Sequence, residues 1–178
     1  VRVPDGQLAT PRAAQLAESP ARFQLIGAMN PCPCGYLGSS AHACRCTPDQ
    51  IHRYQSQLSG PLMDRIDLHV EVPNLAHADL LGAPPGESTD SIRARCGAAR
   101  ARAVERQGSS NMALHGQAID QHVQLDANAL KFLNVAASRL GWSARGTHRA
   151  LKVARTIADL AGAQHTQVAH LAEAMQYR

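Results

Sequence analysis

Residues 143–162, SARGTHRALKVARTIADLAG, predict the helix that decides the class of the C-terminal half of the chain. Ser143 can cap its first turn, and Gly162 can end it. Apolar side chains recur between these ends at helical spacing and mark one face for burial, namely Leu151, Ala154, Ile157, Ala158 and Ala161. The same kind of pattern continues from residue 90 onward, so that half of the chain is predicted to be all-helical.

Three further helices are expected around this one. The first covers residues 91–107 and ends at Gly108, the second runs from a cap at Asp126 to Gly141, and the third follows a cap at Thr166. Residues 108–125 are expected to form a loop. The apolar positions expected to face the core are Leu130, Leu133, Ala137, Leu140, Val168, Leu171 and Met175, with Cys96 as a small buried residue. The C-terminal part is therefore predicted to be a bundle of four helices.

The N-terminal part carries strand signals instead. Residues 23–29, FQLIGAM, form a short apolar run before Asn30-Pro31, which predicts a buried strand of the kind found in parallel sheets. Residues 66–72, IDLHVEV, alternate apolar and polar side chains and predict a second strand. Residues 1–3 and 7–9 are compatible with the two arms of a hairpin across Pro4-Asp5-Gly6.

A helix is expected between the two strands. Thr47 and Gln50 can form a capping box with Pro48 at the first helical position, and Gly60-Pro61 would stop the helix near Leu58. The predicted fold class is therefore an α/β part over residues 1–75, a linker over residues 76–89 and an all-α domain over residues 90–178. The linker is marked by Gly82, Pro84, Pro85 and Gly86.

The composition excludes some classes of protein and leaves others open. No run approaches the roughly 20 apolar residues that a membrane span requires, and no signal for secretion begins the chain. The net charge is +4, the pI is about 9.0, and all but two of the 18 basic residues are arginine. Arginine suits bidentate contact with phosphate, but the excess is equally compatible with a biased genome composition, since the chain is also rich in alanine.

Four cysteines lie close together in the sequence: Cys32, Cys34, Cys44 and Cys46 form the pattern C-x-C-x9-C-x-C. Four thiolates can close a tetrahedral structural zinc site with no open position for catalysis. Gly35 and Gly38 would let the backbone wrap around the ion, and His42 is a spare ligand. The alternatives are free thiols, or two disulfides that lack the support of a secretory signal.

Four polar side chains are candidates for chemistry on local grounds. Asn30 lies at the carboxyl end of a predicted strand, where α/β sheets bind ligands, although an Asx turn before proline explains it as well. Arg65 has Asp64 and Asp67 beside it and is compatible with a surface ion pair. Arg145 lies in the first turn of a helix, where an anion is favoured, and Arg149 lies one turn later. The arginines of residues 91–107 are expected to form a solvated face.

Five stretches together resemble one family closely: AMNPCPCGY (28–36), SGPLMDRIDLHVEV (59–72), GES (86–88), SAR (143–145) and LKVARTIADL (151–160). The family is the magnesium-chelatase-like AAA+ ATPases of the ComM competence type, and the resemblance runs almost from end to end. It implies a bacterial cytoplasmic ATPase that uses ATP and Mg²⁺, assembles into homo-hexamers and drives DNA branch migration.

The resemblance also implies roles for individual residues. Asn30 matches the sensor-1 residue that places the attacking water. Arg65 matches the arginine finger presented to the neighbouring subunit, and Arg145 matches the sensor-2 arginine at the start of a lid helix. Arg149 is a weaker nucleotide-binding candidate from its position one turn later on the same helix. Cys32, Cys34, Cys44 and Cys46 match a family cysteine cluster, for which Zn²⁺ is the expected ion.

The sequence also departs from the family pattern. It contains no G-x-x-x-x-G-K-[ST] phosphate-binding loop, and no apolar run ending in adjacent acidic residues precedes Asn30. Together with a first residue that is Val1 rather than Met, this suggests the C-terminal part of a motor, comprising the end of the α/β core, the cysteine insert and the helical lid. Such a fragment is expected to bind ATP weakly and not to hydrolyse it.

Two other functions are compatible with the same residues. One is a chelatase-type motor subunit that inserts Mg²⁺ into a porphyrin. The other is a non-catalytic zinc-containing module that binds nucleic acid through its arginine-rich helix, in a salt-dependent manner.

Overall fold

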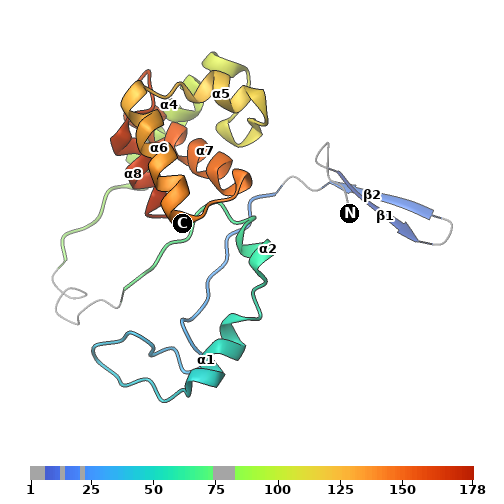
Figure 1. The fold of residues 1–178 in the computed structure, drawn as a ribbon, viewed down its shortest axis with the longest axis vertical. Helices are drawn as coiled ribbons and strands as arrows, with labels where there is room; N and C mark the ends of the chain where they lie inside the picture. The colour runs from blue at the N-terminus through green and yellow to red at the C-terminus, as the bar shows by residue number, and fades with distance from the viewer. Residues whose placement is uncertain (1–6, 13–14, 21–22, 74–82) are drawn as a thin grey trace. The chain divides into compact units, whose positions relative to one another are not determined.

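The computed structural model describes residues 7–12, 15–20, 23–73 and 83–178. The chain divides into two compact units, Val1–Ser56 and Gln57–Arg178. The first unit holds a hairpin, the cysteine loop and helix α1, and the second holds the remaining helices (Figure 1).

In the first unit, strands β1 (Gln7–Arg12) and β2 (Gln15–Pro20) pair antiparallel, with Gln7 opposite Pro20. The expected arm over residues 1–3 lies outside the described residues, and residues 7–9 pair with residues 18–20. Helix α1 (Pro48–Gln55) begins as predicted, because the Thr47 and Gln50 side chains form both hydrogen bonds of the capping box. It ends at Gln55, three residues before the predicted end.

The two predicted strands of the α/β part do not form in this structure. Residues 23–29 and 66–72 have no strand assignment. Apart from the half-buried Ile66, their apolar side chains are exposed, with Phe23 at 76% and Val72 at 85% exposure. A strand is completed by hydrogen bonds to a neighbouring strand, and among the described residues no strand pairs with either segment. The β1–β2 hairpin is the only sheet in the part of the chain that the structure describes.

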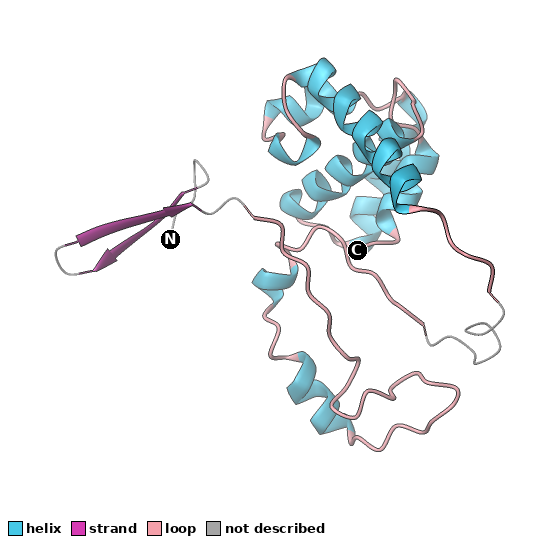
Figure 2. Cartoon of the chain, turned by 180° about the vertical axis from the view of Figure 1, so that it is seen from behind, coloured by secondary structure: helices cyan, strands magenta, loops and turns pink. Residues whose placement is uncertain are grey.

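The second unit is helical (Figure 2), and this agrees with the all-helical prediction for residues 90–178. Its elements are α2 (Gly60–Met63), α4 (Thr89–Gln107), the 3-10 helix η1 (Asn111–Ala113), α5 (Gln117–Val123), α6 (Ala127–Leu140), α7 (Ala144–Leu160) and α8 (Val168–Met175). The predicted stops at Gly108 and Gly141 are confirmed, because both residues adopt positive φ at the ends of α4 and α6. Gly60-Pro61 does not stop α1, which has already ended at Gln55; the two residues begin α2, and Ser59 caps it.

Helix α7 lies at the centre of this domain and contacts α4, α5, α8 and η1. Ser143 caps it as predicted, accepting a hydrogen bond from the Gly146 N–H. The buried apolar cluster combines Leu114, Ile119, Val123, Ala129, Leu133, Leu151, Ala154, Leu171 and Ala174. Three of these come from residues 108–125, so the predicted loop is wrong there: Leu114, directly after η1, and two residues of α5 supply part of the core.

Several expected core positions are also wrong. Helix α6 buries Ala129, Leu133 and Ala136, whereas Leu130 is 50% exposed and Leu140 also faces solvent. The buried face of α6 is thus rotated by about one residue from the expected face. It buries Ala129 and Ala136, which are smaller than the expected Leu130 and Leu140. Cys96 is exposed because the first turns of α4 cover nothing, and burial in that helix begins at Ala99.

Thr166 does not cap the last helix. It is fully buried, and its hydroxyl donates to the Val123 carbonyl at 2.6 Å. Its backbone forms an isolated parallel bridge with Leu125. Gln167 precedes α8 instead and forms a capping box with His170. Thr166 therefore ties the end of α5 to the beginning of α8.

A buried charge network joins α4, η1 and α7. Asp159 of α7 accepts hydrogen bonds from Arg106 at 2.6 and 3.0 Å, from Arg155 at 3.0 Å and from Asn111 at 2.8 Å. Arg155 and Asp159 are almost completely buried. The solvated arginine face predicted for residues 91–107 is therefore wrong for Arg106, whose side chain is only 16% exposed. Arg102 stays exposed as predicted, although it donates to the Asp159 carbonyl at 2.7 Å.

Arg155 also closes the end of α7. Its guanidinium donates to the carbonyls of Ala163 at 2.6 Å and Gln164 at 2.8 Å. Burial alone would raise the pKa of Asp159, but hydrogen bonds from Arg106 and Asn111 and the charges of Arg155 and Arg106 hold that pKa below its usual value. The carboxylate is therefore ionised at neutral pH and balances buried positive charge.

Within the described residues, no helix has the length and apolar character needed to cross a membrane.

We expect Leu133→Ala to destabilise the helical domain much more than Leu130→Ala. Leu133 is buried in the core cluster, so its truncation should cost about 2–5 kcal/mol of unfolding free energy, whereas Leu130, half exposed on the same helix, should cost below about 1 kcal/mol. Denaturant unfolding of the two variants checks this. Equal losses would show that α6 does not pack as described.

We expect Asp159→Asn to cost about 3–5 kcal/mol at neutral pH, because it leaves the Arg155 charge buried without a counter-ion. The native pKa of Asp159 is lowered, so its stabilisation is present above the usual Asp pKa and is lost as the pH falls below about 4. Unfolding measured from pH 7 to pH 3 should therefore show a steeper acid loss in the unmodified chain than in Asp159→Asn. The matched control is Asp90→Asn, which changes an exposed carboxylate. If Asp90→Asn lowered the unfolding free energy as much as Asp159→Asn does, the prediction would be contradicted.

Candidate functional site

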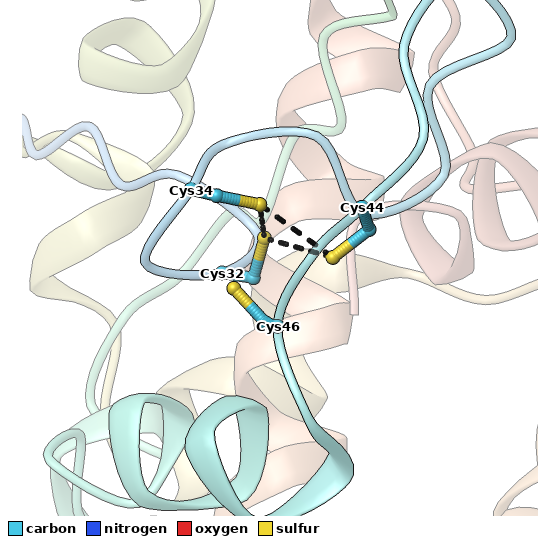
Figure 3. Close-up of side chains that lie close together, drawn as sticks. All are labelled: Cys32, Cys34, Cys44 and Cys46. Carbon is cyan, nitrogen blue, oxygen red and sulfur yellow. Dashed lines mark hydrogen bonds between the residues drawn. The ribbon is translucent and has the colours of Figure 1, made fainter.

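The four cysteines predicted to bind metal converge in the structure. The sulfur of Cys32 lies 3.4 Å from that of Cys34 and 3.7 Å from that of Cys44, and the Cys34 and Cys44 sulfurs are 3.6 Å apart (Figure 3). Cys46 completes the cluster, and all four sulfurs lie within 4.8 Å of one another. Cys32 is buried and the other three are half-buried.

The backbone of this loop is shaped to bring the sulfurs together. Gly35 and Gly38 both have φ of +80°, which permits the two tight reversals that the other residue types adopt rarely. The Gly35 N–H donates to the Cys32 carbonyl at 3.0 Å, and Cys46 directly precedes the cap of α1. At the other end of α1, the Gln55 side chain donates to the Pro31 carbonyl at 3.1 Å. Helix α1 thus closes back on the beginning of the loop.

The electrostatics of the cluster favour a cation. Backbone N–H groups of Tyr36 and Arg45 lower the pKa of the Cys34 thiol to about 6. A backbone N–H from Cys34 also favours ionised Cys46, but burial and the adjacent Cys34 and Cys32 sulfurs outweigh it and raise the pKa of Cys46 to about 12. Four thiolates this close therefore ionise together only when a positive charge lies among them.

The geometry fits zinc. Tetrahedral coordination with Zn–S bonds of about 2.3 Å requires sulfurs about 3.8 Å apart, close to the three separations between Cys32, Cys34 and Cys44. Four protein ligands fill the coordination shell, so an ion held here would have a structural role. His42 stacks on Tyr36 with ring centroids 4.9 Å apart.

The arginine candidates of the second unit lie on α7 and beside α2. Arg145 is exposed in the first turn of α7, and Arg65 is exposed one residue after Asp64, the cap of α2. Arg149, one turn after Arg145, donates to the Arg65 backbone carbonyl at 2.6 Å and forms an ion pair with Asp67. The structure therefore joins the Arg65 segment to α7, and Asp67 pairs with Arg149 rather than with Arg65.

Asn30 belongs to the other unit. It is exposed in an irregular segment directly before Pro31, and its amide lies beside Gly35 of the cysteine loop. Its predicted place at a sheet edge has no sheet in the described residues. Its role as sensor 1 stays a prediction, as do the nucleotide roles of Arg65 and Arg145.

Comparison with known families identifies the group to which the chain belongs. A family model described as "Magnesium chelatase, subunit ChlI C-terminal" matches residues 86–178, and one described as "Magnesium chelatase, subunit ChlI" matches residues 2–80. The chain belongs to the magnesium-chelatase-like AAA+ family. The boundary between the two matches falls within the predicted linker over residues 76–89.

Members of this magnesium-chelatase-like family align with nearly the whole chain. Competence protein ComM of Haemophilus influenzae is 41% identical over 97% of the chain, the protein YifB of Escherichia coli 40% over 99%, and the protein Rv2897c of Mycobacterium tuberculosis 36% over 98%. The alignments cover 34% or 35% of these relatives, so the chain spans about a third of their length.

The sequence did not identify the partner that holds the Arg65 segment. In the sequence, Asp67 lies on the polar side of a predicted strand and close to Arg65, with which a surface ion pair is expected. The His69 N–H donates to the Tyr177 carbonyl at 2.8 Å, so the C-terminus also holds this segment. Neither contact has a signal in the sequence, because the partners are more than 80 residues apart.

We expect the purified chain to bind one zinc ion through the cysteine cluster. Cys34→Ser and Cys44→Ser should each lose the ion, because each removes one of four ligands. The measurement is metal content by mass spectrometry after dialysis, followed by release to a chromogenic chelator. Binding should weaken as the pH falls, since protons compete for the thiolates.

The matched control is Cys96→Ser, which changes the exposed cysteine outside the cluster and should leave the zinc content unchanged. A metal-free chain after expression and refolding with added zinc would contradict the prediction.

Proposed function

We propose that the chain is the C-terminal part of a cytoplasmic AAA+ ATPase that works as a homo-hexameric motor and drives DNA branch migration. The observation that carries the proposal is the arrangement of the second unit. Exposed Arg65 and exposed Arg145 lie on segments that Arg149 joins directly. The 41% identity to a competence protein supports the DNA-motor branch of the family.

In this proposal three side chains of this chain respond to bound nucleotide, and Arg65 does so at the site of the neighbouring subunit. Phosphoryl transfer requires positioning and stabilisation of negative charge more than covalent chemistry. Arg145 would contact phosphate from the first turn of α7, where the helix N-terminus also favours an anion. Arg65 would reach the nucleotide of the neighbouring subunit, and Asn30 would orient the attacking water. ATP and Mg²⁺ would be gripped by the phosphate-binding loop of the full-length protein, since these 178 residues contain no such motif.

The cysteine cluster has a supporting role in the proposal. A zinc ion held by Cys32, Cys34, Cys44 and Cys46 would fix the loop that directly follows Asn30. The loop has little apolar material to hold it otherwise, because Cys32 is its one fully buried residue. When bound, the ion supplies a cross-link between the two ends of the loop and no catalysis.

A second function is favoured by the description of the family models. Both models are named for the magnesium chelatase subunit ChlI, so a motor that inserts Mg²⁺ into a porphyrin is the alternative. ATPase activity stimulated by DNA supports the first function, and activity stimulated by a porphyrin and its chelatase partner subunits supports the second.

We expect Arg65→Ala in the full-length protein to lower the DNA-stimulated ATPase rate by about a thousandfold or more, the effect typical of an arginine finger. Arg145→Ala should weaken ATP binding and also lower the rate. The matched control is Arg139→Ala, an exposed arginine in the last turn of α6. The 178-residue chain alone should show no turnover.

Mixing inactive subunits tests the action of Arg65 in trans. Arg65→Ala subunits mixed with subunits that lack the phosphate-binding lysine should regain part of the ATPase rate, because each supplies what the other lacks. Full activity of Arg65→Ala, or tight ATP binding by the chain alone, would contradict the proposal.

A further inference from the structure

The segment that follows α2 is fixed to the helical domain by three long-range contacts. Arg149 of α7 donates to the Arg65 carbonyl at 2.6 Å and pairs with the carboxylate of Asp67. His69, two residues further on, donates its backbone N–H to the Tyr177 carbonyl at 2.8 Å. The Arg65 side chain itself remains exposed.

Arg149 is the more buried member of its ion pair with Asp67. Its side chain is 22% exposed, whereas that of Asp67 is 55% exposed, so the pair lies at the edge of the domain. One terminal nitrogen of Arg149 serves both acceptors, the carbonyl of Arg65 and the carboxylate of Asp67. Lys152 lies three residues along α7 and also feels the Asp67 charge, which raises its pKa against the larger effect of burial. Asp67 thus pairs with Arg149, and its charge also acts on Lys152.

The C-terminal residue contributes to the same end of α7. A side chain added at Gly146 would meet the Arg178 guanidinium at 3.5 Å and the Ser143 hydroxyl at 3.6 Å. The first turn of α7, which bears Arg145, is therefore packed beneath the C-terminus. A displacement of this turn would act on Arg149 directly, because both arginines belong to one continuous helix.

We propose that Arg149 and Asp67 form a latch that couples the lid helix α7 to the arginine-finger segment, with Arg149 as a positioning residue rather than a nucleotide contact. The inference rests on the proposed function of Arg65 and Arg145. When Arg145 engages the nucleotide of its own subunit, α7 moves, and the latch carries the backbone of Arg65 with it. The state of one ATP site thereby sets how Arg65 is presented to the next site.

The alternative role for Arg149 is direct contact with phosphate. In that role its guanidinium would have to leave Asp67 and the Arg65 carbonyl, and the finger segment would lose its contact with α7. The two roles make different predictions. A latch affects the catalytic step at the neighbouring site, whereas a phosphate contact affects ATP affinity.

The test is a double-mutant cycle in the full-length protein, with Arg149→Ala, Asp67→Ala and both together. For each variant kcat and KM of the DNA-stimulated ATPase and the Kd of a fluorescent ATP analogue are measured. We expect each single variant to lower kcat about ten- to hundredfold, as for a misplaced catalytic group, with little change in Kd. The kcat of the double variant should be no lower than that of the less active single variant, because the pair acts as a unit.

Two controls make the outcomes separable. Arg139→Ala should leave kcat unchanged, and thermal unfolding of every variant shows whether the fold survives. If Arg149→Ala unfolds, Asp67→Ala carries the test, since it changes an exposed side chain outside α7.

Normal kcat in Asp67→Ala and Arg149→Ala, while Arg65→Ala is inactive, would overturn the latch and leave the proposed function standing. A raised Kd for the ATP analogue in Arg149→Ala, with Asp67→Ala normal, would overturn it in favour of a phosphate contact. Normal activity in Arg65→Ala would instead overturn the proposed function on which the latch rests.

Discussion

The carboxylate of Asp159 is the interaction on which the helical domain depends. It is almost completely buried, and it accepts hydrogen bonds from Arg106, Arg155 and Asn111. Arg155 carries a full charge inside the domain, and a buried charge without a counter-ion is strongly destabilising. The network joins α4, η1 and α7 around one anion. Contacts among alanines alone would permit several packings of these helices, whereas the hydrogen bonds to Asp159 favour one arrangement.

Helix α7 extends from the buried network around Asp159 to the candidate site. Its C-terminal end carries Arg155 and Asp159, its middle packs Leu151 and Ala154 into the core, and its first turns carry Arg145 and Arg149. Because α7 contacts four other elements, its first turn has a fixed support from which to hold a phosphate.

The cysteine loop is stabilised differently from the helical domain. With little apolar area to bury, it depends on glycine reversals and on four sulfurs near one point.

Local patterns predicted the ends of elements better than their faces. Ser143, Asp126, Gly108 and the capping box at Thr47 act as expected, because a cap involves residues within a few positions of one another. The exposed Leu130 and the helix α5 were not foreseen, because burial depends on which neighbour covers a face. The predicted strands over residues 23–29 and 66–72 need a sheet, and none of the described residues supplies one for them.

What the sequence determined by itself was the family, the all-helical character of residues 90–178 and the convergence of the four cysteines, since each depends on residues close together in the chain. Only the tertiary structure decided that Asp159 gathers Arg106 and Arg155, and that Arg149 holds Asp67 and the backbone of Arg65. The reason is physical: an arginine in a sequence has many acceptors within reach of its long side chain. Packing of the helices leaves it few acceptors, and the cost of burying charge without a partner favours a carboxylate among them.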